Sequence, residues 1–201
     1  MKNKIKLLGV FGVLVLLILL AFKPKNEVKL IVIDAGHGGK DFGATIGDIT
    51  EKQVVQNIAN KIKSFNKNSE IEIVLIRDED KFIDLNERVS KINNLNPSLL
   101  ISLHVNSSEK NYKSGVNAYV YRDNEFYSKS SECANKLVNK LSEKLVRGEV
   151  KDANYLVLKN SKCPAITLEI GYLSNELDKK YIVSENGQNQ IANKILEYLE
   201  E

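Results

Sequence analysis

The sequence predicts an α/β fold, in which a single domain holds a mixed, mainly parallel sheet flanked by helices, preceded by an N-terminal apolar segment. Two observations carry this prediction. Strand-length apolar runs rich in β-branched residues alternate with segments whose apolar residues recur three or four positions apart. The 201 residues are also enough for one domain with a core of its own.

The expected elements follow one another along the chain. A helix should begin after Thr50, because a threonine followed three residues later by Gln53 forms a capping box. Pro97 should end a second helix. The expected strands cover residues 28–34, 71–76, 98–105, 115–121, 155–158 and 164–170. The later helices cover residues 85–95, 128–146, 175–182 and 188–199.

Residues 1–26 differ in composition from the rest of the chain. Five lysines and no acidic residue flank an apolar run at residues 7–22, which is the layout of a secretory signal. The run is short for a membrane span, which needs ~20 residues, and no Ala-x-Ala site follows it. A cleaved signal peptide and an uncleaved membrane anchor both stay open. Either one would place residues 27–201 outside the cytoplasm.

The charge of the remaining chain limits the class of partner. The formal net charge is +3, but residues 27–201 hold 24 basic and 26 acidic residues. Because no positive excess remains there, nucleic acid is not expected as a partner. Cys133 and Cys163 are expected as unpaired, partly buried thiols, although a disulfide outside the cytoplasm stays open.

Both histidines of the chain lie near predicted strand ends. His37 follows the first strand in a glycine-rich turn, and His104 lies near the end of the third. Glu169 lies at the end of the last strand. Because ligand sites of such sheets gather beyond the carboxyl ends of the strands, these side chains should converge. Two imidazoles, one carboxylate and a position for water make a catalytic zinc set. A turn histidine and a core histidine bonded to backbone groups are the alternatives.

Glu51 is ambiguous on its pattern alone. It falls in the first turn of the helix that follows Thr50, where a carboxylate is favourable to the helix dipole. That explanation needs no ligand, so a role for Glu51 in binding a metal stays open at this point.

Several motifs together resemble the zinc-dependent N-acetylmuramoyl-L-alanine amidases of the type 3 family. They are Asp34-Ala-Gly-His-Gly-Gly-Lys-Asp-Phe-Gly-Ala44, Glu51-Lys52, Arg77-Asp78, Leu85-x-x-Arg88, Ser102-Leu-His-Val-Asn106, Arg147-Gly148, Tyr155-Leu-Val-Leu158 and Leu168-Glu-Ile-Gly-Tyr-Leu-Ser-Asn175. The resemblance covers residues 28–200.

The resemblance implies a set of site residues and a reaction. It implies that His37, Glu51 and His104 bind Zn²⁺ and that Glu169 is the catalytic carboxylate. The implied reaction is hydrolysis of the amide between N-acetylmuramic acid and L-alanine of the peptidoglycan stem peptide. Asn106 and Arg147 are implied as substrate contacts.

The layout of an export segment followed by one domain is similar to that of the spore-cortex amidases, which remove stem peptides before muramic-δ-lactam forms. This similarity implies action at the cell envelope or between forespore and mother cell. It also implies recruitment by the N-terminal segment or an accessory protein. Two alternatives remain: another zinc hydrolase of the envelope, such as a peptidase or deacetylase, and a non-catalytic protein that binds the wall.

Overall fold

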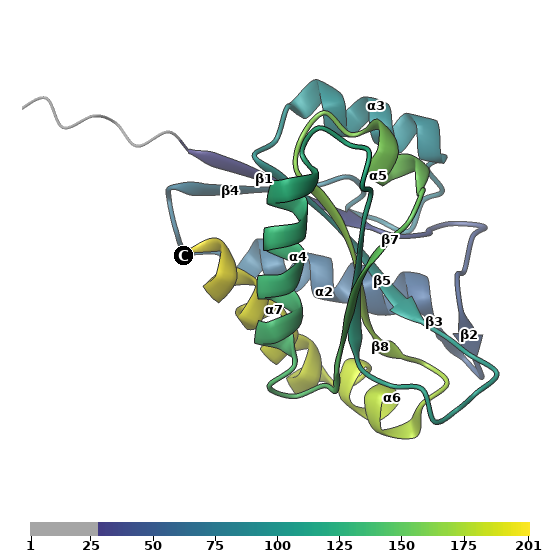
Figure 1. Ribbon diagram of the computed structural model, residues 1–201. Helices are drawn as coiled ribbons and strands as arrows, with labels where there is room; N and C mark the ends of the chain where they lie inside the picture. Colours follow the sequence, from purple (N-terminus) through teal and green to yellow (C-terminus); the bar gives the residue numbers. More distant parts are fainter. Residues whose placement is uncertain (1–27) are drawn as a thin grey trace, which may run out of the picture.

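The computed structural model describes residues 28–201, which form a six-stranded sheet between two layers of helices (Figure 1). In spatial order the strands are β4 (Ile71–Leu75), β1 (Lys29–Ala35), β5 (Leu99–Asn106), β8 (Ala165–Tyr172), β6 (Val116–Val120) and β7 (Arg147–Asp152). The first four are parallel to one another, β6 is antiparallel to β8, and β7 is parallel to β6. The predicted mixed, mainly parallel sheet is therefore confirmed.

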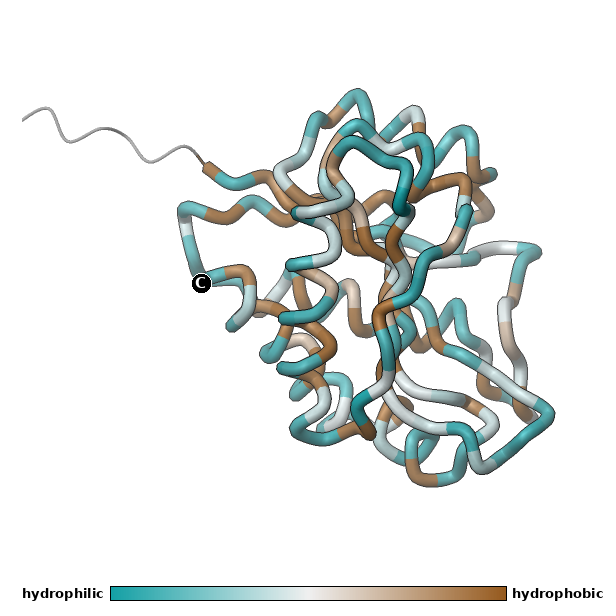
Figure 2. The backbone as a smooth tube through the Cα atoms, viewed as in Figure 1, coloured by the Kyte–Doolittle hydropathy of each residue, from teal (hydrophilic) through white to brown (hydrophobic). Residues whose placement is uncertain are grey.

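The helices divide unequally between the two faces of the sheet. One face is covered by α2 (Glu51–Phe65), α4 (Tyr127–Leu141) and α7 (Glu185–Leu199), and the other by α3 (Leu85–Leu95) and α5 (Leu156–Asn160). A short helix, α6 (Glu176–Ile182), connects β8 to α7, and a small hairpin of β2 (Thr45–Ile46) and β3 (Ile49–Thr50) precedes α2. The apolar strands run through the centre of the molecule, as Figure 2 shows.

Successive side chains along each strand point alternately toward the two layers of helices. Ile31 and Ile33 belong to the core on the side of α2, which packs against β1, whereas Val32 belongs with Leu100 to the smaller core beneath α3 (Leu85–Leu95) and α5. Successive side chains of a strand point to opposite faces. The same alternation therefore places the polar side chains near the strand ends on the α3 and α5 face: Asp34, Ser102, His104, Thr167 and Glu169.

Two expected elements differ from the structure, and one strand was not expected. The strand expected at residues 155–158 is wrong, because these residues enter helix α5, whose Val157 and Leu158 are buried. A run of only four apolar residues does not distinguish a strand from a helical turn. The helix expected at residues 128–146 ends at Leu141. Strand β7 was not expected, because an exposed edge strand with the sequence RGEVKD lacks apolar alternation.

The capping box at the start of α2 is formed only in part. Thr50 is the N-cap residue, as predicted, but its hydroxyl donates to Oε1 of Gln53 at 3.0 Å and makes no cap hydrogen bond to the backbone. The backbone N–H of Glu51 donates instead to the carbonyl of Ala44 at 2.8 Å. The start of α2 is thereby joined to the loop that follows β1.

A buried ion pair connects helix α3 to the sheet. Arg88 in α3 and Asp34 in β1 form a salt bridge, and both residues are almost fully buried. The hydroxyl of Ser102 donates to the second carboxylate oxygen of Asp34 at 3.0 Å. Removing one partner of a buried pair leaves an uncompensated charge, which is more damaging than losing an exposed pair.

We expect Arg88→Met to lower the free energy of unfolding by about 3–5 kcal/mol, because the Asp34 carboxylate would stay buried without the cation that pairs with it. Urea denaturation of residues 28–201 measures the change. The matched control is Lys91→Met on the same helix, where the partly exposed pair with Glu87 should contribute less than about 1 kcal/mol. Equal losses in the two variants would contradict the role given to the buried pair.

Candidate metal centre

His37 occupies a strained turn directly after β1. Its φ of 59° lies in the left-handed region, which costs a non-glycine residue about 1–2 kcal/mol. The turn continues through Gly38 and Gly39, both with positive φ, and Gly38 exchanges two backbone hydrogen bonds with Asp41. A loop that folds back on itself in this way directs the imidazole of His37 toward α2 and β5.

Two buried arginines hold the backbone of this turn. Arg77 donates to the carbonyl oxygens of Ala35 and Gly36, at 2.9 and 2.7 Å. Arg88 donates to the carbonyl oxygens of Ala35 and His37. Hydrogen bonds from a charged donor contribute about 1.5–3 kcal/mol each. They therefore outweigh the cost of the left-handed conformation at His37.

The side chains of His37, Glu51 and His104 meet at one point. One potential ligand atom of each lies within 4.8 Å of the others. Oε1 of Glu51 is 3.0 Å from Nε2 of His37 and 3.0 Å from Nδ1 of His104. The three residues come from the loop after β1, the first turn of α2 and strand β5. The structure thus brings together all three residues that the sequence resemblance implied as metal ligands.

Further hydrogen bonds fix two of these side chains. Nδ1 of His37 is 2.9 Å from Oδ2 of Asp41, which leaves Nε2 directed at Glu51. The backbone N–H groups of Ala44 and Val105 donate to the two oxygens of Glu51, at 2.9 and 3.0 Å. Metal-binding histidines usually have such a carboxylate partner on the second ring nitrogen.

The charges of the three side chains depend on one another. Burial acts to raise the pKa of Glu51, but hydrogen bonds with His104 and His37 outweigh it and hold that pKa well below its usual range. Burial acts to lower the pKa of His37, but contacts with Glu51 and Asp41 raise it overall. The group therefore favours a carboxylate with positive charge beside it, and a bound cation can supply that charge.

Two glycines leave the space that these side chains fill. A Cβ at Gly36 would lie 2.3 Å from Cε1 of His104. A Cβ at Gly43, where φ is +64°, would lie 2.5 Å from Oε2 of Glu51. Both positions therefore require glycine for the close approach of the backbone to the site.

Glu169 in β8 lies beside His104 in the register of the sheet. Among the buried side-chain polar atoms of residues 28–201, only its Oε2 lacks a hydrogen-bond partner. Burial raises the pKa of Glu169 to about 7. A buried carboxyl group without a partner, close to neutrality in its pKa, is suited to exchanging protons with a bound substrate or water.

His37, His104 and Glu169 line a cleft of about 720 Å³ on the α3 and α5 face. Its other walls come from the segment before and at the start of α3, and from the start of α5. Phe82, Leu85 and Tyr155 stay partly exposed there. The lining residues also include Asp34, Gly36, Asp41, Ile83, Asp84, Asn86, Arg88, Ser102, Asn154, Leu156, Val157 and Thr167.

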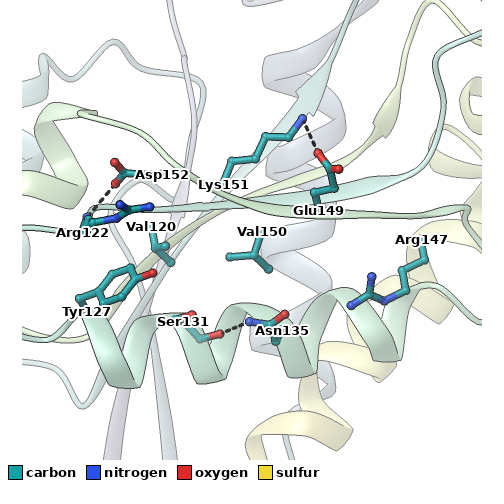
Figure 3. A pocket seen from close by; sticks show the side chains of 10 residues that line it. All are labelled: Val120, Arg122, Tyr127, Ser131, Asn135, Arg147, Glu149, Val150, Lys151 and Asp152. Atoms are coloured by element: carbon teal, nitrogen blue, oxygen red, sulfur yellow. Dashed lines mark hydrogen bonds and ion pairs between the residues drawn. The ribbon is translucent and has the colours of Figure 1, made fainter.

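The two residues implied as substrate contacts lie elsewhere. Arg147, at the start of β7, lines a separate cavity between β7 and α4 (Figure 3). Its Nε donates to Oδ1 of Asn139 at 2.7 Å. Asn106 ends β5 and its Oδ1 accepts from the backbone of Ser107. Neither residue lines the cleft around Glu169.

Asp41 is a site residue that the sequence analysis did not single out. Its signal was its position four residues after His37, within the same glycine-rich loop. Arg77 and Arg88 were noted only as parts of motifs, because nothing local indicates that their guanidinium groups bind carbonyls of another segment. Cys133 and Cys163 are free thiols, as expected, but both are fully buried and not partly exposed.

The N-terminal segment 1–26 lies outside the described residues. Its interpretation as a signal peptide or membrane anchor therefore stays a prediction. Within residues 28–201, no helix is both long enough and apolar enough to cross a membrane.

Comparison with known proteins supports the fold and the family. The protein called uncharacterized YqiI of Bacillus subtilis is 33% identical over 177 residues, which cover 85% of this chain and 82% of that protein. The germination-specific N-acetylmuramoyl-L-alanine amidase of the same organism is 25% identical over 224 residues, which cover 97% and 93%.

Solved structures agree with this result. An N-acetylmuramoyl-L-alanine amidase from Clostridium difficile 630 superposes with a TM-score of 0.81 at 27% identity, covering 87% of this chain and 96% of that one. The CwlD amidase from Clostridioides difficile, solved in complex with the GerS lipoprotein, gives a TM-score of 0.76 at 27% identity, covering 86% and 98%. A family model described as N-acetylmuramoyl-L-alanine amidase matches residues 31–201. This chain therefore belongs to the N-acetylmuramoyl-L-alanine amidase family.

Proposed function

We propose that this amidase depends on zinc, with His37, Glu51 and His104 as ligands and Glu169 as the catalytic carboxylate. The observation that carries the proposal is the convergence of the three donor groups next to a buried carboxyl oxygen without a partner. Two imidazoles and one carboxylate are a donor set of catalytic zinc sites. The proposed reaction cuts the amide between the lactyl group of N-acetylmuramic acid and L-alanine.

The proposed roles follow from the positions of the side chains. When bound, zinc polarises a carbonyl group and lowers the pKa of a water molecule to about 7. Glu169 accepts the proton of the attacking water and delivers it to the nitrogen of the departing L-alanine. Asp41 holds His37 in the tautomer that keeps Nε2 free, and the backbone of Ala44 and Val105 orients Glu51.

We expect purified residues 28–201 to bind one zinc ion per chain, measured by elemental analysis after dialysis. His37→Ala should lose the ion, because it removes a ligand. Asp41→Asn should keep the ion but weaken its binding by about 10- to 100-fold, since the outer partner of a ligand histidine changes.

The matched control is Asp123→Asn, an exposed aspartate that contacts only the hydroxyl of Tyr121 among the described side chains. It should bind zinc as the unmutated protein does. Unchanged zinc content in His37→Ala would contradict the proposed ligand set.

We expect Glu169→Gln to keep its zinc and lose at least about 100-fold in activity, because an amide cannot accept the proton of the attacking water. The measurement is mass spectrometry of digested peptidoglycan. The unmutated protein should release stem peptides that begin with L-alanine and leave muramic acid without peptide.

The same products separate the alternatives. Cleavage within the peptide would indicate a peptidase, and loss of acetyl groups would indicate a deacetylase. A protein that binds peptidoglycan equally well with or without Glu169 and releases nothing would be a wall-binding protein. Each of these outcomes would contradict the proposed reaction.

We further propose that the enzyme acts outside the cytoplasm on spore-cortex peptidoglycan, with residues 1–26 as signal or membrane anchor. The likeness to the germination-specific amidase of Bacillus subtilis over nearly the full length of both chains supports this role. The likeness to CwlD, which was solved with the GerS lipoprotein, supports an accessory protein for recruitment or activation.

We expect the full-length chain to restore muramic-δ-lactam in a spore-forming strain that lacks its own germination-specific amidase. Lactam content of purified cortex, measured by chromatography of muropeptides, checks this outcome. The Glu169→Gln chain, expressed at the same level, serves as the control. Cortex that holds no lactam despite amidase activity in the same spores would contradict the cortex role and leave the reaction itself standing.

A further inference from the structure

Three side chains, Tyr155, Tyr119 and Lys151, form a strip that extends the cleft across the sheet, away from the three proposed ligands. In the register of β8 and β6, Glu169 pairs with Asn117 and Thr167 pairs with Tyr119. Tyr119 in turn pairs with Lys151 of β7. Because directly paired residues of neighbouring strands share a face, Tyr119 and Lys151 lie on the face of Glu169.

The side chains of β7 confirm this direction. Figure 3 shows Lys151 and Glu149 pointing away from helix α4, while Val150 points toward it. Lys151 therefore belongs to the sheet face that carries the cleft, although Lys151 itself also lines part of the cavity beside α4 at this edge of the sheet. On this side Lys151 is at the outer edge of the sheet.

Tyr155 connects the cleft with this strip. It lines the cleft as the N-cap residue of α5, and its ring centroid lies 5.3 Å from that of Tyr119. Tyr155 is 43% exposed, so an aromatic surface is open to a ligand. Burial raises the pKa of Tyr172 in β8, while the charge of Lys151 opposes that shift and the charge of Glu169 adds to it.

The ammonium group of Lys151 is accessible. Within residues 28–201 its one ion pair is with Glu149 at 3.1 Å, and the side chains of the two residues are 47% and 73% exposed. An exposed pair of this kind contributes at most about 1 kcal/mol. A carboxylate of a ligand could therefore replace or join Glu149 as the partner of Lys151.

The proposed reaction indicates from which end of the strip the substrate peptide would extend. Glu169 delivers a proton to the departing nitrogen, so the peptide portion of the substrate lies on the side of Glu169. The strand of Lys151 is two strand spacings from that of Glu169, about 10 Å. An extended peptide advances about 3.3 Å per residue, so it would reach Lys151 with its second or third residue.

We propose that Tyr155, Tyr119 and Lys151 form a subsite for the stem peptide, in which Lys151 pairs with a peptide carboxylate two or three residues beyond the scissile amide. This inference rests on the proposed function, because Glu169 sets the direction. It assigns the enzyme a preference for stem peptides whose carboxylates are free over those in which they are amidated.

The test measures binding of uncleaved substrate by calorimetry, with all variants made in the Glu169→Gln chain. The probes are a synthetic N-acetylmuramoyl tripeptide with free carboxylates and the same compound with those groups as amides. Lys151→Gln should weaken binding of the free acid about three- to fivefold, the range of an exposed charge pair, and leave the amide unchanged. Glu149→Gln should strengthen binding of the free acid, because it removes the competing carboxylate.

Two further variants serve as controls. Lys136→Gln removes the same charge from an exposed pair with Glu132 on α4, which covers the other face, and should change neither affinity. Tyr155→Ala should weaken binding of both probes, because its contact does not depend on charge. Equal effects of Lys151→Gln on acid and amide, or no effect on either, would overturn the subsite.

The calorimetric test of the subsite is independent of the test of the reaction. Mass spectrometry of the products with the active chain tests which bond is cut, whereas calorimetry tests where the peptide lies. A protein that cuts the expected amide but binds acid and amide alike would keep the proposed function and lose the subsite.

Discussion

The site depends on the hydrogen bonds between two buried arginines and the carbonyl groups at the end of β1. The chain turns there into a left-handed residue, His37, which a chain without such support would avoid. Arg77 and Arg88 donate to three successive carbonyls of residues 35–37 and come from different segments, the loop after β4 and helix α3. The loop of His37 is therefore held by the same contacts that attach α3 to the sheet, which couples the stability of the fold to the geometry of the site.

Electrostatics connects this framework to the chemistry. Glu51 and Glu169 are two carboxyl groups in one buried region, but their hydrogen-bond partners differ and their pKa values shift in opposite directions. Glu51 has two imidazoles and two backbone N–H groups around it, so it stays ionised. Glu169 has an oxygen without a partner and a pKa raised to about 7 by burial. Two carboxyl groups with separated pKa values can take two roles, one as a ligand and one as a proton carrier.

Sequence analysis could predict what the strand pattern determines. His37, His104 and Glu169 lie at the ends of parallel strands, so their convergence followed from the fold class. Glu51 could not be assigned from its pattern, because a carboxylate in the first turn of a helix has a local explanation. Strand β7 gave no signal, since its charged residues protect an exposed edge and do not face a core. Arg147 was implied by motif alone, and its place beside α4 depends on that unexpected strand.

Because α5 is short, the face of the sheet that α3 and α5 cover carries both a small apolar core and the cleft. Val157 and Leu158 bury themselves with α3 and close the core above β5 and β8. The helix spans only five residues, so it leaves the carboxyl end of β8 and the paired part of β6 without a helical cover from α5. Tyr155 precedes it in an extended conformation, which lets its ring reach Tyr119. Tyr155 and the first turn of α5 therefore border the cleft that reaches Glu169.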